Sequence, residues 1–345
     1  MIKIDVDERK WEKIKEEHSE WYSNNILPNI RNAYEFIESQ KSKSYSIKKY
    51  LELLKKIIDK GKDFIIQKEL FLDYEKKEID KIIKIMKKKN KKSKSILEIR
   101  FEKLNISEEY LPNQLFCYKK LQTGNKDWNR HKLLSLIGIE ICPYCQRNYI
   151  SSYEENNSKK TTADLDHFYP KSLYPFLALS LYNFIPSCQI CNSRFKGNKD
   201  VWSSVYPYEE GFDELGVKFR TSKEVISEIL GERYSDFYVK IDYENLKNKE
   251  DVEKVKNSIE NLGLDRVYKK SHNQYIQNLL YNIEKYPENY LENCVEMFES
   301  NVDKKKQLEE YFKDIVKEPY RKRIENGEPL AKLTKDILEE FNIKI

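Results

Sequence analysis

The stretch that decides the fold runs from residue 142 to residue 197. It begins with CPYC at 142–145, continues with DHFYPKS at 166–172 and ends with NFIPSCQICNSRFKG at 183–197. Two Cys-x-x-Cys pairs therefore bracket an Asp-His pair. Two residues between paired thiolates suit one face of a tetrahedral ion, and two such pairs complete a zinc site that is closed to water. We therefore expect a structural Zn²⁺ bound by Cys142, Cys145, Cys188 and Cys191.

The segment between the two pairs is longer than in a simple zinc ribbon. It spans residues 146–187, which is 42 residues, and it contains Asp166 and His167. A metal ion that binds both ends of such a segment would hold its geometry. The alternative is four reduced, buried thiols without metal, while the presence of two pairs argues against a redox role. The isolated cysteines, Cys117 and Cys294, are expected to be small buried residues.

The composition limits the fold class. The 345 residues suggest two or three domains, and nine Gly and ten Pro are few for this length, so mostly regular structure is expected. Abundant Lys, Glu, Ile and Leu favour helices. No run of about 18 apolar residues occurs, so we expect neither export nor a membrane span, and we predict a cytoplasmic location. The net charge of +5, from 63 basic and 58 acidic residues, is weak evidence for a nucleic-acid partner.

Both flanks of the central stretch have helical patterning. We expect a mainly α protein with a small α+β insert: an N-terminal helical region at 1–115, a central metal-binding domain at 116–210 and a C-terminal helical region at 211–345. Helices are predicted at 128–136 with Asp127 as N-cap and Gly138 as the stop, at 223–230, at 251–262 with Gly263 as the stop, and at 271–286, 291–298, 304–324 and 330–341, with a short strand at 237–241. In the N-terminal region, Asn24, Asn25 and Pro28 mark a predicted break, and His18 is expected to be an ordinary helix residue.

A run of basic residues lies in the N-terminal region. Residues 81–94 hold eight Lys and no acidic residue. Such a run attracts phosphates by displacing counterions, which favours a nucleic-acid partner. It is equally typical of a solvated helix end or a mobile loop, and a protein partner with an acidic surface is a further alternative.

Asp166 and His167 lie at the end of a predicted strand, residues 161–167. Neighbours on a strand point to opposite faces, so one side chain can ligate a cation while the other addresses a water molecule. A neutral imidazole, with a reference pKa of about 6.5, can take a proton from water at physiological pH. Carboxylate and amide oxygens suit Mg²⁺ or Mn²⁺. Phosphodiester hydrolysis needs this combination of an activated water and positive charge on the reacting phosphate.

Asn183 and Asn192 flank the second Cys pair. Asn192 directly follows Cys191, so the metal site would determine its direction. Helical continuation places Lys196 one turn further along the same face. We expect Asn192 to bind the cation and either Lys196 or Arg194 to contact a phosphate at or beside the scissile bond. Each Asn taken alone is also typical of a turn or a helix cap.

Together these blocks resemble the zinc-knuckle branch of the HNH endonucleases, and the resemblance covers only the central part of the chain. It implies a ββα-metal fold, in which a hairpin and a helix surround one catalytic divalent ion. It also implies that His167 is the general base, that Asp166 is a metal ligand and that Asn183 braces the hairpin loop. The last position of the motif is often His in this family. Here Asn192 occupies it and still offers an oxygen ligand.

The DHFYPKS block also resembles HNH effectors of bacterial anti-phage systems such as Septu and related retrons. This resemblance implies cleavage of DNA in defence and, as in Septu, an ATPase partner. No glycine-rich nucleotide loop is visible in this chain, so any dependence on ATP would come from such a partner. RNA is an alternative substrate, since such a centre recognises a phosphodiester rather than a base. A zinc-stabilised nucleic-acid-binding or scaffolding module without chemistry is the other alternative, although it would not need Asp166, His167 and Asn192 together.

Overall fold

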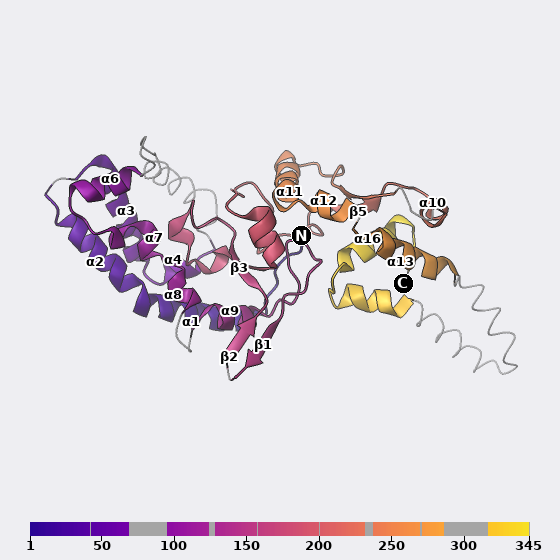
Figure 1. Cartoon of the computed structure of the whole chain (residues 1–345), viewed down its shortest axis with the longest axis horizontal. Helices are drawn as coiled ribbons and strands as arrows, with labels where there is room; N and C mark the ends of the chain where they lie inside the picture. Colours follow the sequence, from indigo (N-terminus) through magenta and orange to yellow (C-terminus); the bar gives the residue numbers. More distant parts are fainter. Residues whose placement is uncertain are drawn as a thin grey trace, which may run out of the picture. The chain divides into compact units, whose positions relative to one another are not determined.

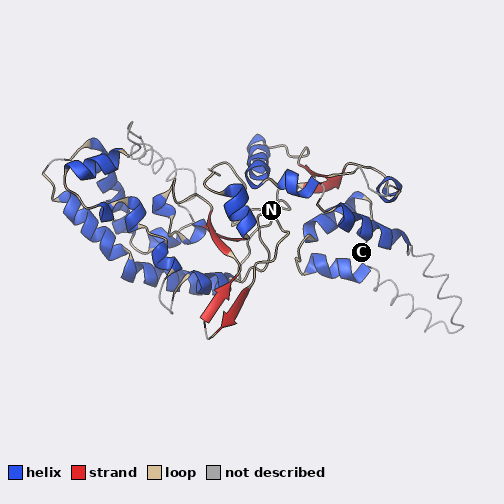
Figure 2. Ribbon diagram, in the orientation of Figure 1, coloured by secondary structure: helices blue, strands red, loops and turns tan. Residues whose placement is uncertain are grey.

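A computed structural model describes residues 1–41, 43–68, 95–123, 128–156, 158–199, 201–231, 237–269, 271–285 and 317–344. The described chain is mostly helical, with three small antiparallel sheets of two strands each (Figures 1 and 2). The lysine run at 81–94, the proposed cap Asp127 and the predicted helix at 291–298 lie outside these residues.

The chain divides into two compact units. Unit 1 comprises Met1–Ile4, Ile141–Tyr149 and Ser203–Ile345, and unit 2 comprises Asp5–Glu140 and Ile150–Trp202. Neither unit is continuous in sequence. The functional division at residues 115 and 210 stays a prediction.

The helices of unit 2 follow the expected apolar periodicity. In the helix α3, the side chains of Ile47, Tyr50, Leu54 and Ile57 recur every three or four residues and are buried. Asn25 ends α1 and Pro28 lies in the first turn of α2, which confirms the predicted break. In the part of unit 2 that the structure describes, the α-helices are α1 (Glu8–Asn25), α2 (Leu27–Glu38), α3 (Tyr45–Lys60), α4 (Asp63–Ile66), α6 (Ile96–Lys103), α7 (Pro112–Leu115), α8 (Lys119–Gln122) and α9 (Arg130–Ile137).

The helix α9 begins two residues later than predicted. The side chain of Asn129 accepts hydrogen bonds from the backbone N–H groups of His131 and Lys132 and so caps the helix. Gly138, with φ of 70°, ends α9 in the left-handed conformation, as expected from the sequence.

The predicted strand at 161–167 is divided between two hairpins. In unit 2, β1 (Ser152–Glu155) pairs with β2 (Ser158–Thr161), and β3 (Asp164–His167) pairs with β4 (Phe184–Ser187). The hydroxyl of Thr161 accepts a hydrogen bond from the backbone N–H of Ala163 at 3.0 Å. This local bond competes with ladder pairing, so the chain turns between β2 and β3. The prediction of one continuous strand at 161–167 was therefore wrong.

Unit 1 packs helices against a hairpin of β5 (Lys218–Thr221) and β6 (Val239–Asp242). Its core includes Phe219, Phe237, Leu279, Leu333 and Ile337. The predicted helices at 251–262, 271–286 and 330–341 and the strand at 237–241 are confirmed within two residues at each end, whereas the helix at 223–230 is shorter. The helices described in this unit include α10 (Ile226–Leu230), α11 (Lys249–Leu262), α12 (Leu264–Lys269), α13 (Asn273–Lys285) and α16 (Ala331–Glu340).

The first residues of the sequence are part of the same unit. The backbone N–H of Ile2 donates to the carbonyl of Pro143 at 2.9 Å, and that of Ile4 donates to the carbonyl of Pro207 at 2.7 Å. Phe212 in turn donates its N–H to the carbonyl of Met1 at 3.0 Å. Three segments that are distant in sequence are thus joined by backbone hydrogen bonds. Within the described residues, no helix combines the length and the hydropathy that crossing a membrane requires.

The buried side chain of His18 ties α1 to the segment before β4. Its Nε2 donates to the carbonyl of Leu179 at 2.8 Å, while Trp128 donates its indole N–H to His18 Nδ1 at 3.0 Å. One nitrogen donates and the other accepts, so the ring is neutral. Burial lowers the pKa of His18 from 6.5 to about 4. His18 is therefore a structural histidine, and not only one residue of a helical stripe.

We predict that His18 makes stability depend on pH. The folded protein keeps this ring neutral while the unfolded chain protonates it below about pH 6.5, so its contribution is complete above that pH and falls toward pH 4. The free energy of unfolding, measured by urea titration at pH 7.5 and 4.5, should fall by about 2–3 kcal/mol more in wild type than in His18→Gln. His131→Gln serves as the control. Equal losses in wild type and His18→Gln would contradict this prediction.

Candidate functional site

Four cysteines form a compact, buried group. The sulfurs of Cys142, Cys145, Cys188 and Cys191 all lie within 4.8 Å of one another, and all four are reduced. Sulfurs that share one zinc at ~2.3 Å are about 3.8 Å apart, so this arrangement is close to one that holds the ion. The four buried cysteines can therefore bind a metal such as zinc.

The backbone around each pair explains this convergence. After Cys142, the chain turns so that the N–H of Gln146 donates to the Cys142 carbonyl at 2.8 Å, and Gln146 itself has a positive φ of 52°. After Cys188, the N–H of Asn192 donates to the Cys188 carbonyl at 3.0 Å and begins a helical segment. Each pair thus lies on a tight turn, which brings its two thiols to one side.

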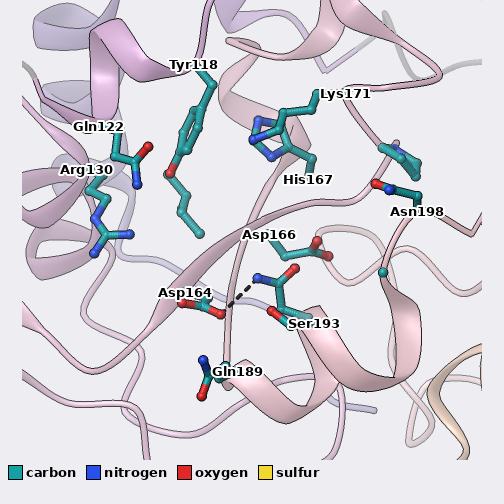
Figure 3. A pocket seen from close by; sticks show the side chains of 14 residues that line it. Tyr118, Gln122, Arg130, Asp164, Asp166, His167, Lys171, Gln189, Ser193 and Asn198 are labelled. Carbon is teal, nitrogen blue, oxygen red and sulfur yellow. Dashed lines mark hydrogen bonds between the residues drawn. The ribbon is translucent and has the colours of Figure 1, made fainter.

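A polar cavity of about 410 Å³ lies in unit 2, between the β3–β4 hairpin and α8 and α9 (Figure 3). Three of the predicted site residues, Asp166, His167 and Asn192, line this cavity. Asn183 and Lys196 do not line it. The remaining lining residues are Tyr118, Gln122, Arg130, Asp164, Leu165, Pro170, Lys171, Gln189, Ser193, Gly197 and Asn198.

The strand β3 supplies three of the lining side chains that can do chemistry. Asp164 and Asp166 are two residues apart, so they share one face of the strand. His167 is the last residue of β3, opposite Phe184, and the chain turns after it through a hydrogen bond from Phe168 to the Asn183 carbonyl at 2.8 Å. Because β3 ends at His167, the neighbouring side chains of Asp166 and His167 can line the same cavity.

The imidazole of His167 is held in one tautomer. Its Nε2 lies 2.9 Å from the carbonyl oxygen of Ala178, which only accepts, so Nε2 carries the proton and Nδ1 carries a lone pair. The rings of Tyr118 and Phe184 meet it edge to face, with centroids at 4.7 and 5.3 Å. Burial, aided by the positive charge of Lys171, lowers the pKa of His167 to about 3. The ring is therefore neutral at physiological pH.

Lys196, one of the two residues expected to contact a phosphate, is buried and does not line the cavity. Its Nζ donates to Asp166 Oδ1 at 3.1 Å and to the His167 carbonyl at 2.6 Å, and its side chain is 1% exposed. Burial lowers the pKa of the Lys196 amine, and the charge of Asp166 opposes this shift. Lys196 thus supports β3 from within the protein through Asp166 and the His167 carbonyl.

The helical segment that carries Lys196 explains its direction. The segment η5 (Ile190–Lys196) is a π-helix rather than an α-helix, and its last turn is closed by a hydrogen bond from Gly197 to the Asn192 carbonyl, five residues back. A wider turn changes the angle between side chains four residues apart. Asn192 therefore lines the cavity while Lys196 points beneath it.

Asn183 braces the loop that follows β3. Its Oδ1 accepts from the backbone N–H of Tyr169 at 2.7 Å, and its Nδ2 donates to the carbonyls of Tyr169 and Leu177 at 3.0 and 2.9 Å. The side chain is completely buried. The same loop supplies Ala178, whose carbonyl orients His167, so Asn183 acts on the cavity through the backbone.

Asp164 is a site residue that the sequence analysis missed. Its Oδ2 accepts a hydrogen bond from Asn192 Nδ2 at 2.9 Å, drawn as the dashed line in Figure 3. The spacing Asp-x-Asp-His was a signal for it, since side chains at i and i+2 of a strand share a face. Tyr118 and Arg130 also line the cavity, but they lie far from the cysteine motif and carried no comparable signal.

Comparisons with known proteins found one informative similarity. No family model and no solved structure matches the chain. The chain is 32% identical over 98 residues to the Septu protein PtuB of Bacillus thuringiensis, which covers 28% of this chain and 34% of that protein. The chain thus matches only about a third of the relative's length.

Proposed function

We propose that the protein is a metal-dependent endonuclease of the HNH type that hydrolyses phosphodiester bonds in DNA during anti-phage defence. The observation that carries this proposal is the presence of His167, Asp166 and Asn192 on one cavity, with Asp164 beside them. The order of β3, β4 and η5 is the strand, strand, helix order of the ββα-metal fold, which we propose for residues 164–196. The similarity to a Septu protein is consistent with this function.

His167 would act as the general base. The carbonyl of Ala178 holds Nε2 as a donor, so the lone pair on Nδ1 is the ring's proton acceptor. A proton taken from a water molecule would therefore reside on Nδ1, and the imidazolium would keep its bond to Ala178. The fixed orientation of the ring reduces the reorganisation needed for this transfer.

The donor set of the cavity fits a hard divalent cation. The oxygens of Asp164, Asp166 and Asn192 would hold it, and a carboxylate has enough lone pairs for Asp166 to bind Lys196 as well. Among all the residues that the structure describes, the cavity included, the four cysteines form the sole group of three or more His, Cys, Asp or Glu at metal-binding distance, so the cavity would rely on two carboxylates and the amide oxygen of Asn192. Mg²⁺ usually takes few protein carboxylates and keeps several waters, which matches this small donor set. When bound, the ion would stabilise negative charge on the reacting phosphate.

We further propose that the cysteine site holds structural Zn²⁺ and that the protein works with a second defence subunit that binds ATP. The similarity to a Septu protein motivates this partner, because the chain itself has no glycine-rich nucleotide loop. Purification of the protein with its neighbouring gene products would show which subunit co-elutes.

The test of this function is metal-dependent cleavage of plasmid DNA. Wild type should nick or linearise supercoiled plasmid with Mg²⁺ or Mn²⁺ and should do neither with a chelator. Asp166→Asn is expected to lower the rate at least about 100-fold, because a neutral amide binds the cation weakly and leaves Lys196 unpaired. Asp164→Asn should raise the cation concentration needed for half-maximal rate. Asp59→Asn, on the exposed face of α3, is the matched control.

Cleavage that persists in chelator, or that is the same in Asp166→Asn and wild type, would refute this assignment. Parallel reactions with RNA distinguish the two possible substrates. Cleavage of RNA but not of DNA would support the same catalytic residues and show that the substrate is RNA. Zinc-containing, folded protein that binds DNA and cleaves neither polymer, with its partner present, would favour the non-catalytic alternative.

A further inference from the structure

Two cationic side chains lie beside the ring of Tyr118 at the cavity. The ammonium of Lys171 lies 4.7 Å from the centroid of the Tyr118 ring. Arg130, from the start of α9, lies on the other side of this ring in Figure 3, near the tyrosine hydroxyl. We call Tyr118, Arg130 and Lys171 the cationic wall. It comes from three separate elements: the residue before α8, the first residue of α9 and the turn after β3.

The two cations of the wall have no carboxylate partner among the residues that the structure describes. Lys171 is exposed and Arg130 is half-buried. By contrast, Lys196 is buried and paired with Asp166, and Lys332 in unit 1 is buried and paired with Asp336. Unpaired charges at a cavity are available for a ligand of opposite sign.

The central tyrosine holds these charges in place and remains neutral. Burial raises the pKa of Tyr118 to about 12, against the nearby charge of Arg130, so the hydroxyl stays protonated at physiological pH. The Tyr118 ring supports the Lys171 ammonium by a cation–π contact and packs edge to face on His167. The wall is therefore adjacent to the imidazole proposed as base.

The charges of the cavity are arranged in two groups of opposite sign. Asp164 and Asp166 project from β3, and Arg130 and Lys171 belong to the wall (Figure 3). A phosphodiester with a divalent cation has the complementary arrangement, since the cation meets carboxylates and the anionic oxygens meet Arg and Lys. A neutral or cationic ligand would leave one group without a partner.

We propose that Arg130 and Lys171 are the residues that bind backbone phosphates of the nucleic acid at this cavity, the role that the sequence suggested for Lys196 or Arg194. Tyr118 is a positioning residue that keeps both cations beside His167. The inference rests on the proposed nuclease function, because that function supplies the polyanionic substrate. Arg130 presents a planar fork of donors to phosphate oxygens, and Lys171 presents a point charge.

The test is binding measured without cleavage. Fluorescence anisotropy of a labelled duplex oligonucleotide in chelator, over a series of NaCl concentrations, gives the dissociation constant and its salt dependence. Arg130→Gln and Lys171→Gln should each weaken binding roughly tenfold and reduce the slope of log K against log salt by about 0.9. The double variant should lose about twice that slope. Lys13→Gln, an exposed lysine of α1 outside the cavity, is the control and should bind as wild type does.

The outcomes separate this inference from the proposed function. Unchanged affinity and slope in the double variant, or a wild type whose binding does not depend on salt, would overturn the cationic wall. If His167→Ala abolishes cleavage while the double variant binds DNA as wild type does, the nuclease function is supported and phosphate binding by the cationic wall is refuted. If wild type cleaves no nucleic acid under any condition but both single variants bind DNA more weakly, phosphate binding by the wall is supported and the nuclease function is refuted.

Discussion

Replacement of His167 by alanine is expected to slow plasmid cleavage by about 10²- to 10⁴-fold, the usual contribution of a positioned general base. The affinity for DNA should change little, because the cations of the wall remain. The expectation follows from the geometry: Ala178 holds Nε2 as a donor, and Nδ1 is left as the acceptor. The measurement is the initial rate of loss of supercoiled plasmid at saturating protein with Mg²⁺.

Added imidazole distinguishes chemistry from folding. A small base that enters the space left in His167→Ala should restore part of the rate, and it should have no effect on wild type. His18→Gln is the matched control, because His18 is also buried and donates to the neighbouring carbonyl, that of Leu179. This variant should lose stability but retain cleavage below its melting temperature. Cleavage by His167→Ala at the wild-type rate would remove His167 from the role of base.

Replacement of Cys188 by serine is expected to release the metal and to destabilise the protein. Wild type should contain about one zinc per chain, since four thiolates complete one tetrahedral site. Zinc binding in such sites contributes folding free energy directly, so loss of several kcal/mol should lower the melting temperature by about 10 °C. Cleavage should also fall, because Asn192 and Lys196 follow this cysteine pair on η5.

Cys117→Ser is the control for this experiment, since Cys117 lies outside the cysteine group and is half-buried. Zinc content is measured by elemental analysis on the same samples as the melting curves. A wild type without metal, together with an unchanged melting temperature in Cys188→Ser, would show that the four cysteines are only reduced, buried thiols.

Local sequence patterns predicted the central features of this molecule. The spacing of the two Cys-x-x-Cys pairs predicted that four thiols would meet, and they do. The glycines at 138 and 263 were correctly read as helix ends, because both adopt the left-handed conformation. The Asp-His pair was correctly placed at the end of a strand, and both residues line one cavity.

Features that depend on tertiary contacts could not be predicted from local sequence patterns. Lys196 was placed on the same helical face as Asn192 because an α-helix was assumed, whereas a π-turn directs it to Asp166. Tyr118 and Arg130 reach the cavity only through the packing of α8 and α9, and no local spacing encodes that approach. His18 seemed an ordinary residue of a helical stripe, because its partner carbonyl at Leu179 is distant in sequence.

The discontinuity of unit 1 has a consequence for biosynthesis. Met1–Ile4 are synthesised before their hydrogen-bond partners at Pro143, Pro207 and Phe212. At translation rates of about 5–20 residues per second, Met1–Ile4 wait on the order of 10–40 s for Pro207 and Phe212. Every residue of unit 2 has been synthesised before these two partners are made. The nascent chain should therefore be able to complete the cavity-bearing unit before Met1–Ile4 make their last hydrogen bonds.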